Sequence, residues 1–203
     1  MTKGKPTLLL IDGHSLAFRA FYALSPDAFK TPDGQHTNAV HGFISMMLSI
    51  IGNEKPSHLA VAFDLSRSSF RTEEYPEYKG TRGETPPEFN GQTELLREAL
   101  ESMNIITLSR ENYEADDIIA SLADQASEQG YRVLIVSGDR DTFQLIQDEV
   151  TILYPVKGVM NLARMTDEAV LEKYGIHAKQ YPDLAALVGE TSCGNSRQSW
   201  RES

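Results

Sequence analysis

Leu8-Leu9-Leu10-Ile11-Asp12-Gly13-His14-Ser15 is an apolar run that ends on an aspartate and turns directly into a helical stretch. Two later apolar runs repeat the pattern, residues 59–63 before Asp64 and residues 133–136 before Ser137-Gly138-Asp139. Apolar runs that alternate with amphipathic helices are typical of an α/β fold, a mainly parallel twisted sheet with helices on both faces. Ligands of such folds bind beyond the carboxyl ends of the strands, so these acids should meet in one crevice.

Further acids extend this set, because Asp141 follows the third run and an acidic cluster around Asp116 opens a helix. Two carboxylates about 4 to 5 Å apart repel by roughly 3 to 4 kcal/mol at an effective dielectric near 20. Folding stability is only about 5 to 15 kcal/mol, so the crowded acids predict a divalent cation, and oxygen ligands suit Mg²⁺ or Mn²⁺. The predicted metal ligands are Asp12, Asp64, Glu114, Asp116, Asp117, Asp139 and Asp141. The alternative is that each acid only caps the helix that follows it.

The composition is that of one globular domain. The chain has 203 residues, of which 40% are hydrophobic, enough to bury a core. No apolar run is long enough to cross a membrane, so we expect no membrane partner. The single cysteine, Cys193, excludes an internal disulfide framework and a cysteine-rich zinc site. We therefore expect a cytoplasmic protein.

The charge distribution separates an acidic body from a basic insertion. The net charge of −10 argues at first against a nucleic-acid partner, because phosphate binding needs cations. Residues 66–90, however, form a poorly periodic stretch with prolines that carries Arg71, Lys79 and Arg82, interleaved with aromatic residues such as Tyr78. Insertions longer than about 15 residues in compact domains are usually functional lids or linkers. The insertion therefore offers a cationic surface that the net charge conceals.

Periodicity predicts the remaining elements. The predicted strands are residues 7–11, 59–63, 105–108, 132–136 and 151–154. The predicted helices are residues 16–24, 39–51 and 92–102, one from the acidic cluster to Gly130, one that contains residues 143–146, and two short ones at 167–174 and 181–188.

A set of short motifs runs along the chain in a fixed order. The motifs are LLIDGHS at 9–15 with Phe18-Arg19, TNAVHGF at 37–43, AFD at 62–64, Phe70-Arg71, YPEYKGTR at 75–82, YEADD at 113–117 and GDRD at 138–141. Walker A, nucleophile-elbow and dinucleotide-binding motifs are absent from the sequence. The ordered set resembles the 5′ nuclease (flap endonuclease) family, most closely its bacterial branch, the N-terminal nuclease domains of type I DNA polymerases.

The resemblance implies a PIN-like 5′-nuclease core in which the 66–90 insertion forms a helical arch that passes a single-stranded 5′ end. It implies a structure-specific 5′→3′ exonuclease and 5′-flap endonuclease that hydrolyses DNA and RNA-primer phosphodiesters with two divalent ions. The implied partners are DNA with 5′ flaps or 5′ ends and RNA primer–DNA hybrids, in replication and repair. We expect a nucleoid-associated monomer, because one crevice with a lid needs no partner subunit.

The resemblance also assigns roles to individual residues. The seven acids match the family's metal ligands, and Asp116 is also assigned a catalytic role. Lys79 and Arg82 match the basic pair of the arch, which would steer the scissile phosphate, and Tyr78 would stack on a neighbouring base. The other residues assigned to nucleic-acid contact are Arg19, Asn38 and Arg71. The alternative for the basic pair is a solvated charged loop.

The end of the sequence departs from the family pattern. After residue 189 the family continues with two acids three residues apart and a glycine-rich helix-hairpin-helix region, whereas this chain has Glu190 and Cys193 and no such region. We expect residues 1–190 to form the catalytic core and residues 191–203 a non-family tail, from a frameshifted or truncated reading frame or a diverged natural end. Because Cys193 is a soft ligand poorly suited to Mg²⁺, the second metal site and the activity should be weakened.

Three other functions remain open. A metal-dependent phosphatase also places aspartates at strand ends, although it does not explain the basic insertion. A non-catalytic nucleic-acid-binding remnant of a nuclease would agree with the altered tail. RNA-cleaving nucleases with a related acidic crevice are usually shorter and lack the arch.

Overall fold

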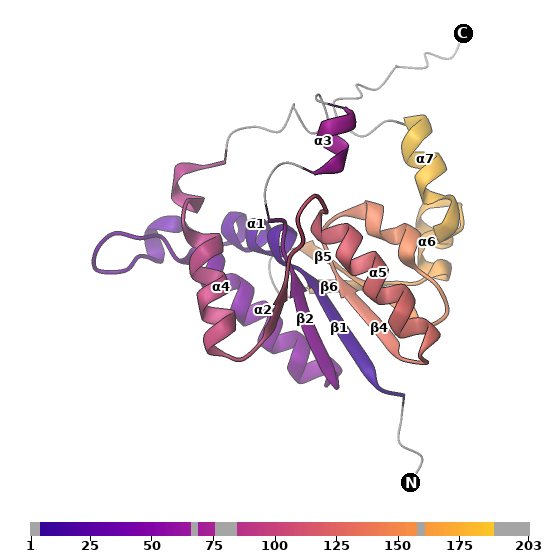
Figure 1. Ribbon diagram of the computed structural model, residues 1–203, viewed down its shortest axis with the longest axis horizontal. Coiled ribbons are helices and arrows are strands. Elements are labelled where there is room, and N and C mark those ends of the chain that lie inside the picture. The colour runs from indigo at the N-terminus through magenta and orange to yellow at the C-terminus, as the bar shows by residue number, and fades with distance from the viewer. Residues whose placement is uncertain (1–4, 66–68, 76–84, 158–160, 189–203) are drawn as a thin grey trace.

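A six-stranded sheet forms the centre of the molecule (Figure 1). The computed structural model describes residues 5–65, 69–75, 85–157 and 161–188. The strands are β1 (Thr7–Asp12), β2 (His58–Ala62), β3 (Ile106–Leu108), β4 (Arg132–Val136), β5 (Val150–Lys157) and β6 (Asn161–Met165). Their order is β3-β2-β1-β4-β5-β6, in which the first five are parallel and β6 is antiparallel to β5. The predicted mainly parallel sheet is confirmed.

Helices cover both faces of this sheet (Figure 1). The α-helices are α1 (Gly13–Ala23), α2 (Asn38–Glu54), α3 (Phe70–Glu74), α4 (Gln92–Ser102), α5 (Ala115–Glu128), α6 (Asp167–Tyr174) and α7 (Tyr181–Val188). The 3₁₀ helices are η1 (Pro26–Ala28), η2 (Pro87–Phe89), η3 (Arg140–Leu145) and η4 (Ala178–Gln180). On one face α1, α2 and α4 pack on residues such as Leu9 and Leu134, and on the other α5, α6 and α7 pack on residues such as Leu10 and Ile135.

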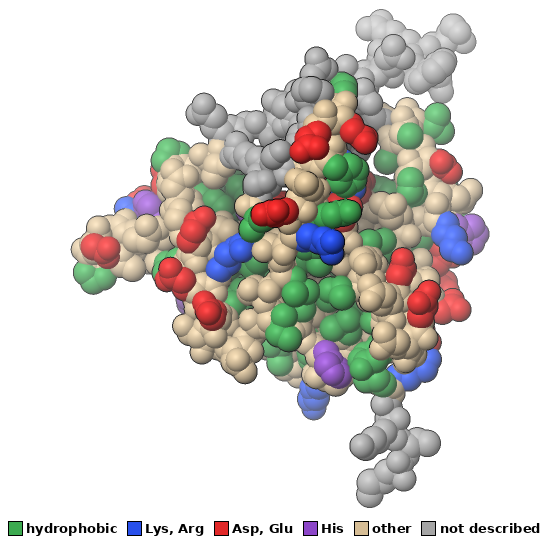
Figure 2. Space-filling view, viewed as in Figure 1, with side chains coloured by type: hydrophobic (Ala, Val, Ile, Leu, Met, Phe, Trp, Pro, Cys, Tyr) green, Lys and Arg blue, Asp and Glu red, His purple; other side chains and the backbone are tan. Residues whose placement is uncertain are grey.

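Burial on both faces explains why the strands read as continuous apolar runs. In β1, Leu9 and Ile11 point into one core and Leu10 into the other, and all three are at most 2% exposed. At the free edge, hydrophobic side chains gather over β3 between α4 and α5 (Figure 2), where Ile106 is 61% exposed. Among the described residues, no helix is both long and apolar enough to cross a membrane.

The last third of the chain differs from the sequence-based expectation. The strand predicted at 151–154 lies within β5, which forms a hairpin with a further strand, β6. The sequence analysis missed β6 because its residues, Asn161-Leu162-Ala163-Arg164-Met165, include few strongly apolar ones. The predicted helix after Asp139 is the 3₁₀ helix η3, which ends before Ile146. Its short length follows from the chain's return to β5 at Val150.

We expected residues 66–90 to form an insertion after β2, and the structure describes its two ends. α3 stands above the carboxyl ends of the parallel strands (Figure 1), but η2 already belongs to the body of the protein. Phe89 is 5% exposed, and its ring stacks on that of Phe18 at a centroid distance of 4.2 Å. The predicted arch residues Tyr78, Lys79 and Arg82 lie outside the described residues.

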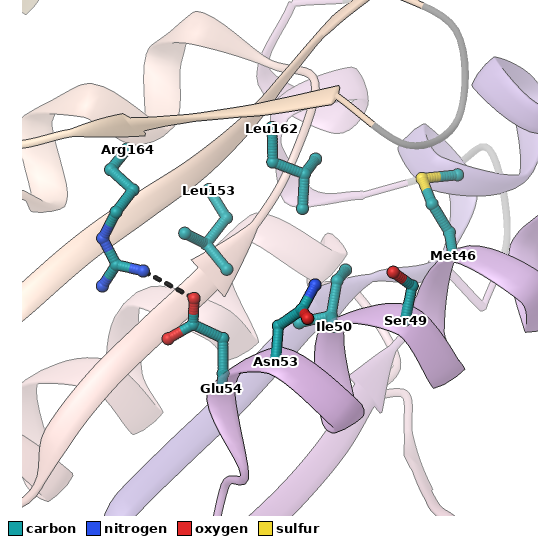
Figure 3. Close-up of a pocket in the computed structure, with 8 residues that line it drawn as sticks. All are labelled: Met46, Ser49, Ile50, Asn53, Glu54, Leu153, Leu162 and Arg164. Carbon is teal, nitrogen blue, oxygen red and sulfur yellow. Dashed lines mark hydrogen bonds and ion pairs between the residues drawn. The ribbon is translucent and has the colours of Figure 1, made fainter.

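A cavity of about 210 Å³ lies between α2 and the β5–β6 hairpin (Figure 3). Its walls include the apolar side chains of Met46, Ile50 and Leu162. Glu54, at the end of α2, accepts a hydrogen bond from Arg164 at 2.6 Å. Arg132, the first residue of β4, lies 3.5 Å from the second oxygen of Glu54.

Candidate metal centre

The carboxyl ends of three adjacent strands bring together three of the predicted acids. β2, β1 and β4 are neighbours and parallel, so their carboxyl ends lie side by side. Asp12 is the last residue of β1, and Asp64 and Asp139 follow β2 and β4. The charges of Asp64 and Asp139 both raise the pKa of Asp12, as expected of carboxylates that lie close together. The residues after the strands therefore form one acidic crevice.

Asp12 lies at the base of this crevice and is only 6% exposed. Its Oδ1 accepts a hydrogen bond from the backbone N–H of Ser15 at 3.0 Å, and its Oδ2 accepts one from Ser137 Oγ at 2.8 Å. Burial first, and the neighbouring carboxylates second, raise the pKa of Asp12 to about 6 against the lowering effect of the two hydrogen bonds. The ionised form of Asp12 is therefore unfavourable in the protein alone.

The acidic cluster on α5 joins the crevice through a direct contact. The backbone N–H of Ala115, the first residue of α5, donates a hydrogen bond to Asp64 Oδ1 at 2.6 Å. Glu114 is 9% exposed, whereas Asp116 and Asp117 are partly exposed. The first turn of α5 thus lies against the end of β2, which places its acids beside those of the strand ends.

Several of these acids also cap the helices that follow them. Asp12 caps α1, and Asp139 caps η3 by accepting a hydrogen bond from the backbone N–H of Asp141 at 3.0 Å. Asp117 accepts one from the backbone N–H of Glu114 at 3.0 Å, within a capping box at the start of α5. Capping and convergence are compatible, because each cap uses part of a carboxylate and fixes its direction.

Arg71 binds the acidic cluster from α3. Its two terminal nitrogens donate hydrogen bonds to the two oxygens of Asp117 at 2.8 and 2.7 Å, a bidentate pair. The same guanidinium lies 3.8 Å from Glu114 Oε2 and stacks over the ring of Phe70 at 4.5 Å. Arg71 was expected to contact nucleic acid, and in the structure it pairs with predicted metal ligands.

Small residues of the strand-to-helix turns hold the crevice in shape. A Cβ on Gly13 would lie 2.4 Å from the Phe63 ring, so only glycine allows the β1 turn to approach the end of β2 this closely. Ser15 Oγ accepts a hydrogen bond from the backbone N–H of Gly138 at 2.9 Å and so joins the β1 and β4 turns. The sequence reasoning gave Ser137 no role, although its place between an apolar run and an aspartate was a usable signal.

Of the other two residues assigned to nucleic-acid contact, Asn38 is buried and Arg19 is not. Asn38 is fully buried, donates hydrogen bonds from Nδ2 to the carbonyls of Phe21 and Leu24, and accepts one from Gln92 Nε2 at 2.8 Å. It has no exposed surface for a nucleic-acid contact, so we correct its role to joining α1, α2 and α4. Arg19 lies on α1 and is partly exposed.

The chemistry of the donor set fits a hard divalent cation. The crevice gathers carboxylate oxygens, and the burial that raises the pKa of Asp12 is opposed most directly by a bound positive charge. Within the described ranges, no three His, Cys, Asp or Glu side chains are yet placed to hold one ion together. Binding would therefore require side chains such as Asp117 to change partners. Glu190 and Cys193, relevant to a second ion, lie outside the described residues.

Comparisons with known proteins agree with this geometry. A family model described as the 5′-3′ exonuclease, N-terminal resolvase-like domain, matches residues 7–175. DNA polymerase I of Mycobacterium tuberculosis (strain ATCC 25618 / H37Rv) is 56% identical over 190 residues, which are 94% of this chain and 21% of that protein. The chain thus spans about a fifth of the length of the curated relatives it matches.

Two solved structures from bacteriophage T5 share the fold. T5 5′-exonuclease with bound divalent zinc ions has a TM-score of 0.73 at 22% identity, covering 96% of this chain and 71% of that chain. T5 flap endonuclease in a pseudo-enzyme-product complex with DNA and metal ions has a TM-score of 0.72 at 21% identity, covering 97% and 71%. Together with the family match, this α/β architecture shows that the chain belongs to the 5′-3′ exonuclease family, of which it carries the N-terminal resolvase-like domain.

Proposed function

We propose that this chain is a divalent-metal-dependent 5′ nuclease, a 5′→3′ exonuclease and 5′-flap endonuclease. The observation that carries the proposal is the crevice of Asp12, Asp64 and Asp139 at the carboxyl edge of the sheet, with the first turn of α5 beside it. The metal ions and DNA in the T5 structures support the same chemistry here. The proposed substrates are DNA with 5′ flaps or 5′ ends and RNA primer–DNA hybrids.

The seven acids would hold the ions. When bound, divalent ions supply a water-derived hydroxide and stabilise the charge on the leaving oxygen of a phosphodiester. Asp12 would orient its carboxylate through Ser15 and Ser137, and Asp64 through Ala115. The remaining ligands would be Glu114, Asp116, Asp117, Asp139 and Asp141.

The basic and aromatic residues would hold the DNA. Lys79 and Arg82 would steer the scissile phosphate, because cations gain affinity from phosphate and offset charge that develops in the reaction. Tyr78 would stack on a base, and Arg19 and Arg71 would contact the backbone. These roles carry over from the family motifs that this sequence contains.

The finer assignments belong to the same proposal. We take the ions to be Mg²⁺ or Mn²⁺. The second site would be weakened because Cys193 stands in the position of the second of two acids, the first of which is Glu190 here. Residues 1–190 would form the catalytic core and residues 191–203 a tail outside it. The nuclease would act as a nucleoid-associated monomer in the cytoplasm.

Cleavage of a labelled 5′-flap DNA, with and without Mn²⁺ or Mg²⁺, tests the proposal. Asp116→Ala should abolish cutting near the junction. Asp124→Ala is the matched control, because Asp124 lies on the same helix but is exposed, away from its first turn. Flap binding without metal-dependent cleavage would instead identify a non-catalytic remnant. Hydrolysis of a small phosphomonoester in preference to the flap would identify a phosphatase.

A further inference from the structure

Three consecutive residues attach α3 to the start of α5. Ser69 Oγ donates a hydrogen bond to Glu114 Oε1 at 3.2 Å, and the Phe70 backbone N–H donates one to the carbonyl of Asn112 at 3.1 Å. Arg71 forms the bidentate pair with Asp117. We call Ser69, Phe70 and Arg71 the α3 latch. Figure 1 shows α3 above the carboxyl ends of the strands, so the latch is the described link between this helix and the acidic crevice.

The latch occupies the lone pairs that a metal ion would need. An ionised carboxylate offers about four lone-pair positions on its two oxygens. On Asp117, Oδ2 accepts from Arg71 and from the backbone N–H of Glu114, and Oδ1 accepts from Arg71, so at least three hydrogen bonds are already made. Asp117 therefore cannot keep the bidentate pair and also present both oxygens to an ion.

Charge also opposes simultaneous binding of Arg71 and a divalent ion. The Arg71 guanidinium also lies 3.8 Å from Glu114 Oε2, between two acids of the cluster. A divalent ion there would stand close to a fixed guanidinium, and two cations a few ångströms apart in a partly buried site repel strongly. Both members of the pair are only partly exposed, Arg71 at 32% and Asp117 at 22% of the side chain, so water screens this repulsion incompletely.

We propose that Arg71 and a divalent cation compete for Asp117, so that metal binding releases the α3 latch and frees the Arg71 guanidinium for a DNA phosphate. This inference rests on the proposed function, because it takes Asp117 as a metal ligand. Arg71 is then a positioning residue, which holds α3 on the crevice when the acids lack metal and lets it move when the acids are loaded.

The test compares the full chain with Arg71→Gln and with Arg97→Gln as the matched control. Arg97 also stacks on an aromatic ring, that of Phe63 at 4.6 Å, but it donates to the backbone carbonyl of Asp64 rather than to a carboxylate. Mn²⁺ affinity is measured by calorimetry. Amide hydrogen exchange is followed across α3, including the Phe70 amide that bonds to Asn112.

Competition predicts a distinct pattern. Arg71→Gln should bind Mn²⁺ at least about fivefold more tightly than the unsubstituted chain, the low end of ordinary coupling between ligands. Mn²⁺ should speed exchange of the α3 amides in the unsubstituted chain and in Arg97→Gln, whereas in Arg71→Gln exchange should be fast without metal. The acceleration in the unsubstituted chain tests the proposal even if Arg71→Gln folds poorly.

Two results would overturn the inference, and only the second would also reject the proposed nuclease function. Normal Mn²⁺ binding with equal affinity in Arg71→Gln, and α3 exchange that Mn²⁺ leaves unchanged or slows, would reject the competition but keep the nuclease proposal. No Mn²⁺ binding to any of the three proteins would reject both.

Discussion

The two ends of the parallel strands surround their acids with groups of opposite charge. At the carboxyl edge, Asp12 is surrounded by hydroxyl and backbone donors and by the carboxylates of Asp64 and Asp139, and its pKa rises. Near the amino end of β4, Glu54 pairs with Arg132 and with Arg164, so cations outnumber the acid. Figure 3 shows the pair of Glu54 with Arg164. Where a carboxylate has only a structural role, as at Glu54, the fold places arginines that balance its charge. The described charged groups that shift the pKa of Asp12 are two carboxylates and no cation, so a cation from outside is expected there.

Replacing Asp12 should have the largest effect, because it should lower activity and raise the stability of the metal-free protein. We expect Asp12→Asn to lower metal-dependent flap cleavage by about 100- to 1,000-fold, comparable with loss of one strong electrostatic contact in an active site. The same change should stabilise the metal-free protein at pH 7 by about 1 to 3 kcal/mol, because it removes an unfavourable buried charge. Flap assays and urea unfolding in EDTA measure the two effects. A variant that is both active and less stable would refute this account of the carboxyl edge.

The pH dependence of stability should carry the signature of Asp12. Its pKa is raised from 3.8 to about 6, so the folded protein takes up this proton before the unfolded chain does. The stabilisation is complete below pH 3.8, where it reaches about 3 kcal/mol, and it is lost as the pH rises through 6. Between pH 7 and pH 5 the metal-free protein should gain about 1 kcal/mol relative to Asp12→Asn. A pH-independent difference between the two proteins would contradict the raised pKa.

Ser137→Ala should give a smaller effect at the same edge. Ser137 is fully buried, donates to Asp12 Oδ2 and accepts from the backbone N–H of Asp139 at 3.1 Å. Its loss should raise the pKa of Asp12 further and cost about 1.5 kcal/mol at pH 7, typical of a hydrogen bond to a charged group. Ser102→Ala, an exposed serine that bonds to a helix carbonyl, is the control for urea unfolding. Equal midpoints for both variants would count against a role of Ser137.

Glu54→Gln should have the smallest effect and should leave cleavage unchanged. Its partners Arg132 and Arg164 are more than a third exposed, so the two ion pairs together should contribute only about 1 kcal/mol. Thermal unfolding and the flap assay measure the contrast with Asp12→Asn. A large loss of cleavage in Glu54→Gln would show that the amino edge also serves the reaction.

The sequence predicted the parts of the fold that depend on local pattern. The boundaries of α4, β4, α6 and α7 agree with the structure, because strong periodicity or capping residues mark them. β6 could not be recognised, because an antiparallel edge strand gains its stability from β5 rather than from its own residues. The convergence of Asp12, Asp64 and Asp139 followed from the rule for parallel strands.

Side-chain hydrogen bonds between segments distant in the chain could not be predicted from the sequence. Nothing near Arg71 in the chain indicates its bidentate pair with Asp117, 46 residues away. Asn38 resembled a surface residue of a motif, but its amide is satisfied by α1 and by Gln92, 54 residues away. Side-chain hydrogen bonds between elements depend on packing geometry, which neither periodicity nor motif spacing encodes.

The insertion after β2 is fastened at its two described ends by bonds of different kinds. At the far end, Gln92 accepts from the backbone N–H of Ala39 at 2.8 Å and donates to Asn38 and to the carbonyl of Glu88, a neutral network that salt does not screen. At the near end, α3 depends on the charges of Arg71 and Asp117, which salt weakens. Rising ionic strength should therefore weaken the contact of α3 with α5 before it weakens the contacts of Gln92.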